Sequence, residues 1–360
     1  SPSVMAVTSG KCGKNVTWKL DGKGTLTISG KGAMKNGLSH ESAAWYSARG
    51  SIKKVVIKNG VTSIGDSAFE DCGKLTKVEI ANSVTKVGHF AFAGCSRIKR
   101  IKIPNKVTDM GSYTFSGCEK LEHIDISTGV KGIGMAAFSN CSQLKSIKLP
   151  KSAKYIGRGA FCECIRLEQI VFPSRIKTIA MEAFYGCSNL KKIYFVGNAP
   201  DIDNSTWADF EEVAFGRVTA TAYYPKGNKT WTSDKLQNYG GKLTWKTWSP
   251  NQPKGVSLVS VTNQKGKKLK VTWKKNAAAT GYEVQYATSS KFKSVKKVKI
   301  KKASTTSTTV SKLTKGKKYY VRIRTYKTVS GKTYYSGWSK AKTAVKVMYW
   351  RRPGKRGKKT

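Results

Sequence analysis

A chain of 360 residues with 39% hydrophobic residues has room for two or three domains and can bury a sizeable core. Its 67 Lys and Arg residues against 20 Asp and Glu residues give a net charge of +47. This balance favours a polyanionic partner, such as nucleic acid, an anionic cell wall, an acidic glycan or a membrane surface, without choosing among them. No apolar run approaches the roughly 18–20 residues of a membrane-spanning helix, which excludes a protein that spans the membrane with helices.

The N-terminal segment predicts a small β cap. The stretch "VTWKLDGKGTLTISGKG" (residues 16–32) alternates polar and apolar residues as a β-hairpin does, and "SIKKVVI" (51–57) alternates as a further strand. We therefore expect residues 1–50 to form an N-terminal β cap that covers the exposed end of a repeat array.

Residues 51–249 predict an array of units with a period of 23 residues and a C-terminal cap that closes it. A cysteine recurs at this spacing, at Cys72, Cys95, Cys118, Cys141, Cys164 and Cys187. A phenylalanine stands three residues before each of them, at Phe69, Phe92, Phe115, Phe138, Phe161 and Phe184. Each unit also carries an alternating segment, "KVEI", "RIKI", "HIDI", "SIKL", "QIVF" or "KIYF", and a second apolar segment such as "VTSIG". A unit this short cannot bury its apolar residues alone, so neighbouring units must stack around one continuous core.

We expect a leucine-rich-repeat type of solenoid that is mainly β with short helical turns. The alternating segments predict short strands, the glycine after the second segment suits a turn, and the small–Phe–x–x–Cys stretch favours a helical turn. The spacing places Tyr46 in the phenylalanine column at the N-terminal end. At the other end it places Phe215 there, after an eight-residue insertion in "DNSTWADFEE" (203–212). The segments "VTATAYYP" (218–225) and "LTWKTW" (243–248) then close the array.

These residues resemble the BspA-like leucine-rich repeats of bacterial surface proteins. The resemblance covers about residues 10–248, including the lead-in "CGKNVTW…GTLTISGKGAM" and the tail "TATAYYPKGNKTW". It implies a secreted or surface-attached protein, and some members of the family are described as adhesins that bind host matrix proteins.

The repeated cysteines are predicted to be small, buried hydrophobic residues. Equivalent side chains in a ladder point in parallel, so they converge neither on a disulfide partner nor on a tetrahedral zinc ion. Cys162 stands two residues before the ladder residue Cys164, so we expect it to face outward. Cys12 lies in the cap, far along the solenoid, which argues against a Cys12–Cys162 bridge.

After a linker, "TWSPNQPKG" (247–255), the period ends and residues 250–348 predict a small β-sandwich. Its six strand-like runs are 269–275, 281–289, 294–302, 307–313, 318–328 and 332–347. They resemble a fibronectin type III module. Trp273 stands at the core tryptophan position, "GYEVQY" fits the third strand, and Tyr319 follows Leu313 at the spacing of a tyrosine corner. The resemblance implies a fold and says little about function.

Positive charge is concentrated at the C-terminal end. Residues 250–360 hold 31 of the 67 basic residues and one acidic residue, Glu283. Residues 349–360, "YWRRPGKRGKKT", predict a basic disordered tail, which is either a solvated terminus or an arm that binds polyanions. The candidate polyanion contacts are Arg322, Arg324, Arg351, Arg352, Lys355 and Arg356.

No pattern in the sequence predicts catalysis. GxSxG, HExxH, P-loop and CxxC patterns are all missing, and His40, His89 and His123 fall at different positions of the repeat. The segment "DIDNS" (201–205) lacks the glycine and the final glutamate of a calcium loop. We expect no enzyme activity, no cofactor and no metal ion.

The outward residues of consecutive strands form the candidate binding face. They are Lys77, Glu79, Arg100, Lys102, His123, Asp125, Ser146, Lys148, Gln169, Val171, Lys192 and Tyr194. Mixed charges with few aromatic residues favour a polar protein or a glycan as ligand. The alternative for each residue is a solvated strand surface.

Three functions are compatible with these features. The first is a secreted or cell-surface, non-catalytic, adhesin-like protein that binds a host or matrix protein or a glycan through this face. The second is a structural cell-wall module whose basic half holds it to anionic wall polymers. Nucleic-acid binding ranks third, because no nucleic-acid-binding pattern is present. We expect a monomer located outside the cell or at a bacterial cell surface.

Overall fold

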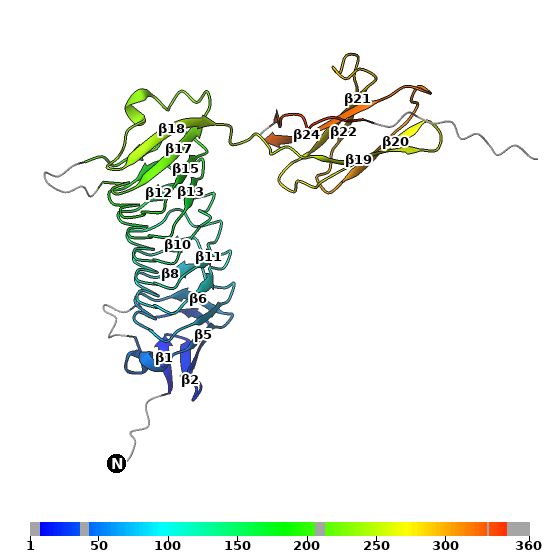
Figure 1. The fold of residues 1–360 in the computed structure, drawn as a ribbon. Coiled ribbons are helices and arrows are strands. Elements are labelled where there is room, and N and C mark those ends of the chain that lie inside the picture. Colours follow the sequence, from blue (N-terminus) through cyan, green and yellow to red (C-terminus); the bar gives the residue numbers. More distant parts are fainter. Residues whose placement is uncertain (1–7, 37–42, 206–212, 330, 344–360) are drawn as a thin grey trace, which may run out of the picture. The chain divides into compact units, whose positions relative to one another are not determined.

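The computed structural model describes residues 8–36, 43–205, 213–329 and 331–343, in two compact units, residues 1–248 and 249–360 (Figure 1). The first is a β-solenoid and the second a β-sandwich, each with its own hydrophobic core. The predicted fold class is confirmed. Residues 206–212 of the predicted insertion and the basic tail lie outside the described residues. Within the described ranges, no helix is long and apolar enough to cross a membrane.

The N-terminal cap is an antiparallel sheet that continues into the solenoid. It consists of β1 (Ser9–Gly13), β2 (Val16–Leu20) and β3 (Thr25–Gly30), and β3 then pairs in parallel with β5 (Lys54–Ile57). The predicted hairpin is confirmed. Its turn is closed by the Asp21 carboxylate, which accepts hydrogen bonds from the N–H groups of Lys23 and Thr25 at 2.9 and 2.8 Å.

The first member of the phenylalanine column is Trp45, so the prediction of Tyr46 was wrong. A 3₁₀ helix, η2 (Tyr46–Ser51), begins directly after Trp45, and this leaves Tyr46 half-buried at the surface under the guanidinium of Arg49. The Trp45 ring stacks on Phe69 at 5.5 Å, and its indole N–H donates to the Ala68 carbonyl at 2.7 Å. The larger ring therefore covers the end of the column.

The alternating segments form the first ladder of parallel strands. After β5 they are β7 (Lys77–Ile80), β9 (Arg100–Lys102), β11 (His123–Asp125), β13 (Gln169–Phe172), β15 (Lys192–Phe195), β17 (Thr219–Pro225) and β18 (Lys242–Trp248). The predicted strand in "SIKL" (146–149) does not form. Ile147 and Leu149 are nevertheless buried, so the alternation there follows from the core and does not need a hydrogen-bonded ladder.

The second apolar segments form a second, shorter ladder. Its strands are β4 (Gly32–Ala33), β6 (Val61–Ile64), β8 (Lys86–Val87), β10 (Asp109–Met110), β12 (Tyr155–Ile156), β14 (Thr178–Ile179) and β16 (Asp201–Ile202). An isolated bridge between Ile133 and Ile156 continues the series in the repeat between β10 and β12. A 3₁₀ turn, η3 (Ser233–Lys235), precedes β18 in the C-terminal part of the unit.

The Phe–Cys stretch is a series of turns and not the expected helical turn. In the first repeat the N–H groups of Phe69 and Asp71 donate to the carbonyls of Ala91 and Ala93 in the next repeat, at 2.8 Å each. The N–H of Cys72 donates within the turn, to Phe69 at 3.2 Å. In a helix the N–H groups would donate to carbonyls of the same helix, and the carbonyls of the next repeat would have no donors. Stacking therefore selects alternating turns, with Asp71 at a positive φ of 57°.

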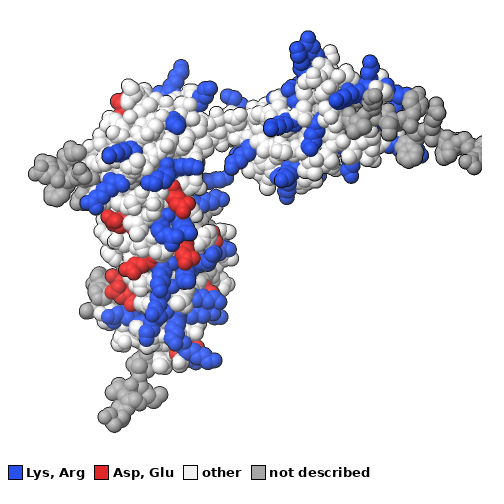
Figure 2. Space-filling view, in the orientation of Figure 1, with Lys and Arg blue, Asp and Glu red and all other residues white. Residues whose placement is uncertain are grey.

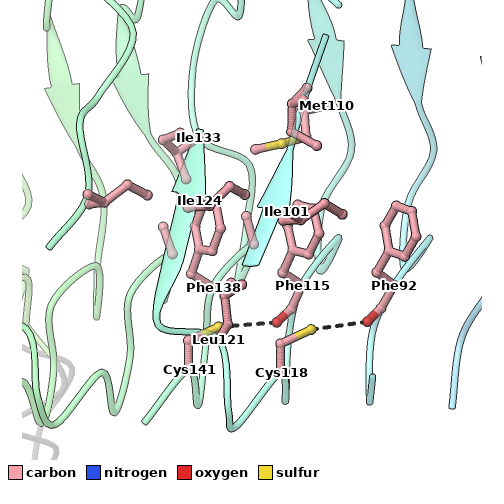
Figure 3. Packing of buried hydrophobic residues seen from close by; sticks show 14 of the residues in the cluster. Phe92, Ile101, Met110, Phe115, Cys118, Leu121, Ile124, Ile133, Phe138 and Cys141 are labelled. Carbon is pink, nitrogen blue, oxygen red and sulfur yellow. Dashed lines mark hydrogen bonds between the residues drawn. The ribbon is translucent and has the colours of Figure 1, made fainter. Parts of the chain in front are cut away.

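The core between the ladders is a column of stacked rings (Figure 3). Neighbouring phenylalanines from Phe69 to Phe215 lie 5.1–5.6 Å apart between ring centroids. Phe215 stacks on Phe184 at 5.2 Å, which confirms that it takes the next place in the column despite the longer spacing.

The ladder cysteines pack and also donate hydrogen bonds. The thiols of Cys95, Cys118, Cys141, Cys164 and Cys187 each donate to the carbonyl of the phenylalanine 26 residues earlier, at 3.0–3.3 Å (Figure 3). Burial raises the pKa of Cys72 and of Cys118 to about 12. All eight cysteines lie among the described residues and are thiols, and Cys162 is half-buried.

We expect one thiol in eight to react rapidly with a thiol reagent at pH 8 in the native protein. The ladder thiols are buried and stay protonated, and burial also raises the pKa of Cys12 to about 11. The rapid phase is expected to disappear in a Cys162→Ser variant, and all thiols should react after unfolding. Rapid modification of two or more thiols in the native chain would contradict this assignment.

The glycines that follow the second ladder allow neighbouring repeats to touch backbone to backbone. A Cβ atom on Gly111 would lie 2.5 Å from the backbone nitrogen of His89 and 2.7 Å from the carbonyl carbon of Gly88. Gly88 and Gly157 have similar neighbours in their own preceding repeats. Glycine is needed at these positions because the backbones of neighbouring repeats approach closely, in addition to the turn that the sequence suggests.

The second unit is a sandwich of two antiparallel sheets. One sheet contains β19 (Leu258–Gln264), β20 (Lys268–Trp273) and β23 (Ser307–Val310). The other contains β22 (Lys296–Ile300), β21 (Gly281–Ala287), β24 (Tyr320–Val329) and β25 (Lys332–Tyr335), and β26 (Lys342–Thr343) pairs with β24. The predicted runs omit β19, because Leu258 is its single buried residue and its alternation is weak.

The interior of the sandwich contains the residues that the sequence assigned to it. Trp273 and Tyr282 are buried with their rings 5.3 Å apart, and Leu313 and Tyr319 are buried beside them. The hydroxyl of Tyr319 accepts a hydrogen bond from the N–H of Thr314 at 2.8 Å. This back-bond is the expected tyrosine corner.

Candidate binding surface

The first ladder carries two columns of outward side chains, which we call the strand face. One column contains Lys77, Arg100, His123, Ser146, Gln169 and Lys192, and all six are exposed. The other contains Glu79, Lys102, Asp125, Lys148 and Val171, which are exposed, and Tyr194, which is half-buried. The parallel register sets equivalent residues opposite one another, as with Arg100 and His123 or Gln169 and Lys192. The structure thus gathers the predicted residues on one side of the solenoid.

The N-terminal part of the strand face combines acidic and basic side chains, and Figure 2 shows both kinds on the surface of the solenoid. Glu79 lies 2.9 Å from the ammonium of Lys54 and 3.1 Å from that of Lys77, and Asp125 lies 3.1 Å from the His123 ring nitrogen. Hydrogen bonds from Lys54 and then Lys77 hold the pKa of Glu79 below its usual value. Exposed pairs of this kind contribute little to stability, so they remain available to exchange partners.

The C-terminal part of the strand face is aromatic. The Tyr194 ring stacks on Tyr223 at 4.7 Å with an interplanar angle of 11°, and the Trp248 ring lies 4.8 Å from Tyr194. Burial and then the neighbouring Tyr223 raise the pKa of Tyr194. The sequence interpretation included Tyr194 and missed Tyr223, because the strand register there is offset by 29 residues instead of 23.

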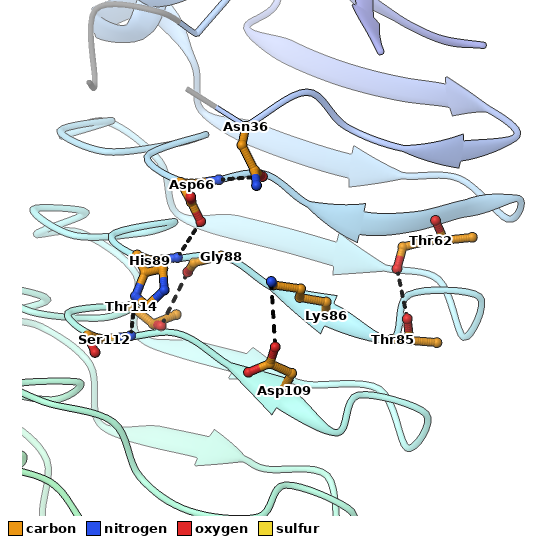
Figure 4. A network of polar contacts seen from close by, with 10 residues as sticks. All are labelled: Asn36, Thr62, Asp66, Thr85, Lys86, Gly88, His89, Asp109, Ser112 and Thr114. Carbon is orange, nitrogen blue, oxygen red and sulfur yellow. Dashed lines mark hydrogen bonds and ion pairs between the residues drawn. The ribbon is translucent and has the colours of Figure 1, made fainter. Parts of the chain in front are cut away.

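The turns beside the second ladder hold a polar network that joins successive repeats (Figure 4). The Asp66 carboxylate accepts from the His89 N–H at 2.8 Å, and His89 Nδ1 accepts from the Ser112 N–H at 2.9 Å. Lys86 and Asp109 form an ion pair at 3.6 Å. Asp66 and His89 thus satisfy backbone N–H groups of the next repeat, and the Lys86–Asp109 pair joins side chains of two repeats. Among the described residues, no group of three or more His, Cys, Asp or Glu side chains is placed to hold a metal ion.

An exposed apolar cluster in the same turns was not anticipated. Phe90 and Tyr113 stack at 4.5 Å, both with positive φ, and the Tyr113 hydroxyl lies 3.4 Å from the Met135 sulfur. Bulky residues rarely adopt this backbone conformation, and the equivalent positions of the other repeats hold Ser67, Ala136, Gly159 and Glu182. Alternation cannot reveal such residues, because they lie in turns.

Arg322 and Arg324 are held within the sandwich surface by aromatic rings. The guanidinium of Arg322 lies 4.4 Å from the Trp338 ring centroid, and that of Arg324 lies at the same distance from it. Arg324 also forms an ion pair with Glu283 at 2.9 Å. Cation–π contacts and this pairing occupy both side chains. Arg351, Arg352, Lys355 and Arg356 lie outside the described residues.

Comparison with known proteins assigns both units. The family described as the BspA type leucine rich repeat region matches residues 41–142 and 115–218, and the fibronectin type III domain matches residues 251–342. The fold and strand face therefore define a leucine-rich repeat protein, a class that binds other proteins and is typically non-catalytic. The chain is a BspA-type leucine-rich repeat protein with a fibronectin type III domain.

Several solved bacterial structures are similar to this chain. A leucine rich cell surface protein from Faecalibacterium prausnitzii A2-165 shares 24% identity over 59% of this chain and 69% of its own, with a TM-score of 0.42. A leucine rich repeat protein from T. pallidum shares 25% identity over 57% of this chain and 82% of its own, with a TM-score of 0.40. No curated protein sequence matches the chain significantly.

Proposed function

We propose that this chain is a non-catalytic binding protein of the extracellular space or the bacterial cell surface, which recognises a host or matrix protein or a glycan. The observation that supports this is the strand face, on which eleven of the twelve outward side chains are exposed. A stacked solenoid holds the strands that carry these side chains at fixed spacing, so binding would not have to order the backbone. The surface is suited to a partner with polar and charged groups along its length.

A second candidate is attachment to an anionic wall polymer through the sandwich. Glu283 is the one acidic residue of residues 250–360, and it is buried and paired with Arg324. The exposed charge of this unit is therefore cationic (Figure 2). Such attraction would fall steeply with ionic strength and would not discriminate between polyanions, nucleic acid included.

Binding of the full chain to a fixed panel at low and high salt separates these functions. The panel contains fibronectin, fibrinogen, acidic mucin glycan, anionic wall polymer and DNA. A double variant on the strand face, Arg100→Ala with Lys102→Ala, is matched by Lys268→Ala with Lys270→Ala on β20 of the sandwich. Both pairs are exposed cations that flank one buried residue of a strand.

We expect salt-resistant binding to one protein or glycan, weakened by the strand-face pair and unaffected by the sandwich pair. Binding to every polyanion alike, abolished by salt and weakened by the sandwich pair, would replace this function with wall attachment. The proposal fails if no component of the panel binds.

A further inference from the structure

The C-terminal end of the strand face differs in chemistry from the rest, and basic hollows lie at both ends of its strands. We define the tyrosine segment as Gln169, Val171, Lys192, Tyr194 and Tyr223, on β13, β15 and β17. Val171 is 42% exposed, and the stacked tyrosines lie next to it in the register. This end thus offers apolar contact area on a rigid sheet, where the N-terminal end offers ion pairs.

A hollow of about 480 Å³ lies where β13 and β15 begin. It is lined by Arg166, Lys191 and Lys192, by the amides of Gln169 and Asn189, and by one carboxylate, Glu168. A second hollow of about 480 Å³ lies beyond the ends of the same strands. Its polar lining comprises Lys154, Arg175 and Lys177 with Ser174 and Asn198, and no carboxylate. Cations therefore stand at both ends of a short strand, with Tyr194 between them.

We propose that the tyrosine segment and its two flanking hollows bind a linear polysaccharide that carries carboxylate groups. This inference rests on the proposed function and names the ligand class of one end of the strand face. Sugar rings present apolar C–H faces and edges of hydroxyl groups. The C–H faces would pack on Tyr194 and Val171, and the hydroxyls would bind the amide and hydroxyl side chains of the hollows. The cations at both ends would pair with carboxylates on separate sugars.

Charge complementarity selects an acidic glycan over a neutral one. The two hollows together place six cations against one carboxylate, Glu168. A single-stranded nucleic acid also combines anionic groups with rings that stack. The Tyr194 ring, however, is already stacked on Tyr223 and flanked by Trp248, so the segment lacks the series of separate open rings on which successive bases stack. The amides at each hollow suit the many hydroxyls of a sugar chain.

The test uses the full chain and a hexasaccharide of hyaluronan as the probe. A neutral chito-oligosaccharide of the same length and a DNA oligonucleotide are the comparison ligands. The first variant is Tyr194→Ala. The second, Lys192→Gln with Arg175→Gln, changes only exposed side chains and so preserves the fold. Its matched control is Lys14→Gln with Lys19→Gln, two exposed cations of the N-terminal cap that lie outside the strand face.

We expect the hexasaccharide to bind and the neutral oligosaccharide to bind at least about ten-fold more weakly. Tyr194→Ala and the Lys192/Arg175 pair should each weaken binding about ten-fold, and the Lys14/Lys19 pair should leave it unchanged. The inference is overturned if the hexasaccharide does not bind, if DNA binds more tightly, or if both lysine-containing pairs act equally. Binding of a protein on the panel that depends on Arg100 and Lys102 would retain the proposed function in each of those cases.

Discussion

Replacing Phe138 with alanine is expected to lower the free energy of unfolding of the solenoid by about 3–5 kcal/mol, the range for a large ring removed from a closed core. Phe138 is fully buried and stacks on Phe115 at 5.6 Å and on Phe161 at 5.4 Å. Each ring between Phe69 and Phe184 has a stacked partner on both faces, so neighbouring repeats would have to tilt together to close the cavity. The measurement is chemical denaturation of the full chain, in which the free energy of unfolding is taken from the transition of the solenoid.

The sandwich supplies an internal reference, because it has a separate hydrophobic core and its own transition should not move. Phe90→Ala is the matched control, since Phe90 is 36% exposed and stacks on one ring, Tyr113. We expect this change to cost about 0.5–1.5 kcal/mol, the value of one aromatic pair. Equal losses for Phe138 and Phe90 would show that the column does not hold the solenoid together.

The period of 23 residues predicts most of the solenoid because stacking places each residue over its equivalent. Phe69 stacks on Phe92, and Val55 pairs with Val78 in the ladder, and the residues of each pair are one period apart in the sequence. Burial follows from the same alignment. In a repeat array, the contacts can therefore be predicted from one unit and its neighbour, without knowledge of the rest of the chain.

The sequence predictions were wrong where contacts with neighbouring structure outweigh the local sequence pattern. The stretch around Phe69 and Cys72 has the composition of a helical turn, yet half of its N–H groups donate to the next repeat. The choice of Trp45 over Tyr46 depends on the start of a 3₁₀ helix, which the spacing of the cysteines does not record. The thiol–carbonyl bonds of residues such as Cys118 were equally hidden, because a buried small residue has the same pattern with or without a hydrogen bond.

The candidate surface likewise contains residues that the sequence pattern predicts and residues that it misses. Alternation alone indicates that Arg100 and Lys102 point outward, and the structure leaves both exposed. It does not find Tyr223, whose register is shifted by the insertion, or Phe90, which lies in a turn. Arg322 is outward by alternation but is held between aromatic rings from elsewhere in the sandwich, and only the folded chain shows this.

Replacing Gly111 with alanine is expected to destabilise the solenoid by about 1–3 kcal/mol, because the added methyl group overpacks a contact between two backbones. The new Cβ would lie 2.5 Å from the His89 nitrogen and 2.7 Å from the Gly88 carbonyl carbon, and neither atom belongs to a side chain that could rotate away. The repeats would have to separate locally. That would strain the hydrogen bond that the Ser112 N–H donates to His89 and the stacking of the phenylalanine rings.

The control is Gly73→Ala, in a turn of the first repeat, where an added Cβ would meet no atom within 4 Å. Gly73 is not among the residues with positive φ, so alanine there should leave stability unchanged or raise it by up to about 1 kcal/mol through the unfolded chain. Both variants are compared by the denaturant midpoint of the solenoid transition, with the sandwich transition as reference. If Gly111→Ala behaves like Gly73→Ala, the repeats are packed loosely enough to accept a methyl group, and close backbone approach does not explain the glycine that five of the six units carry here, the sixth having Ala180.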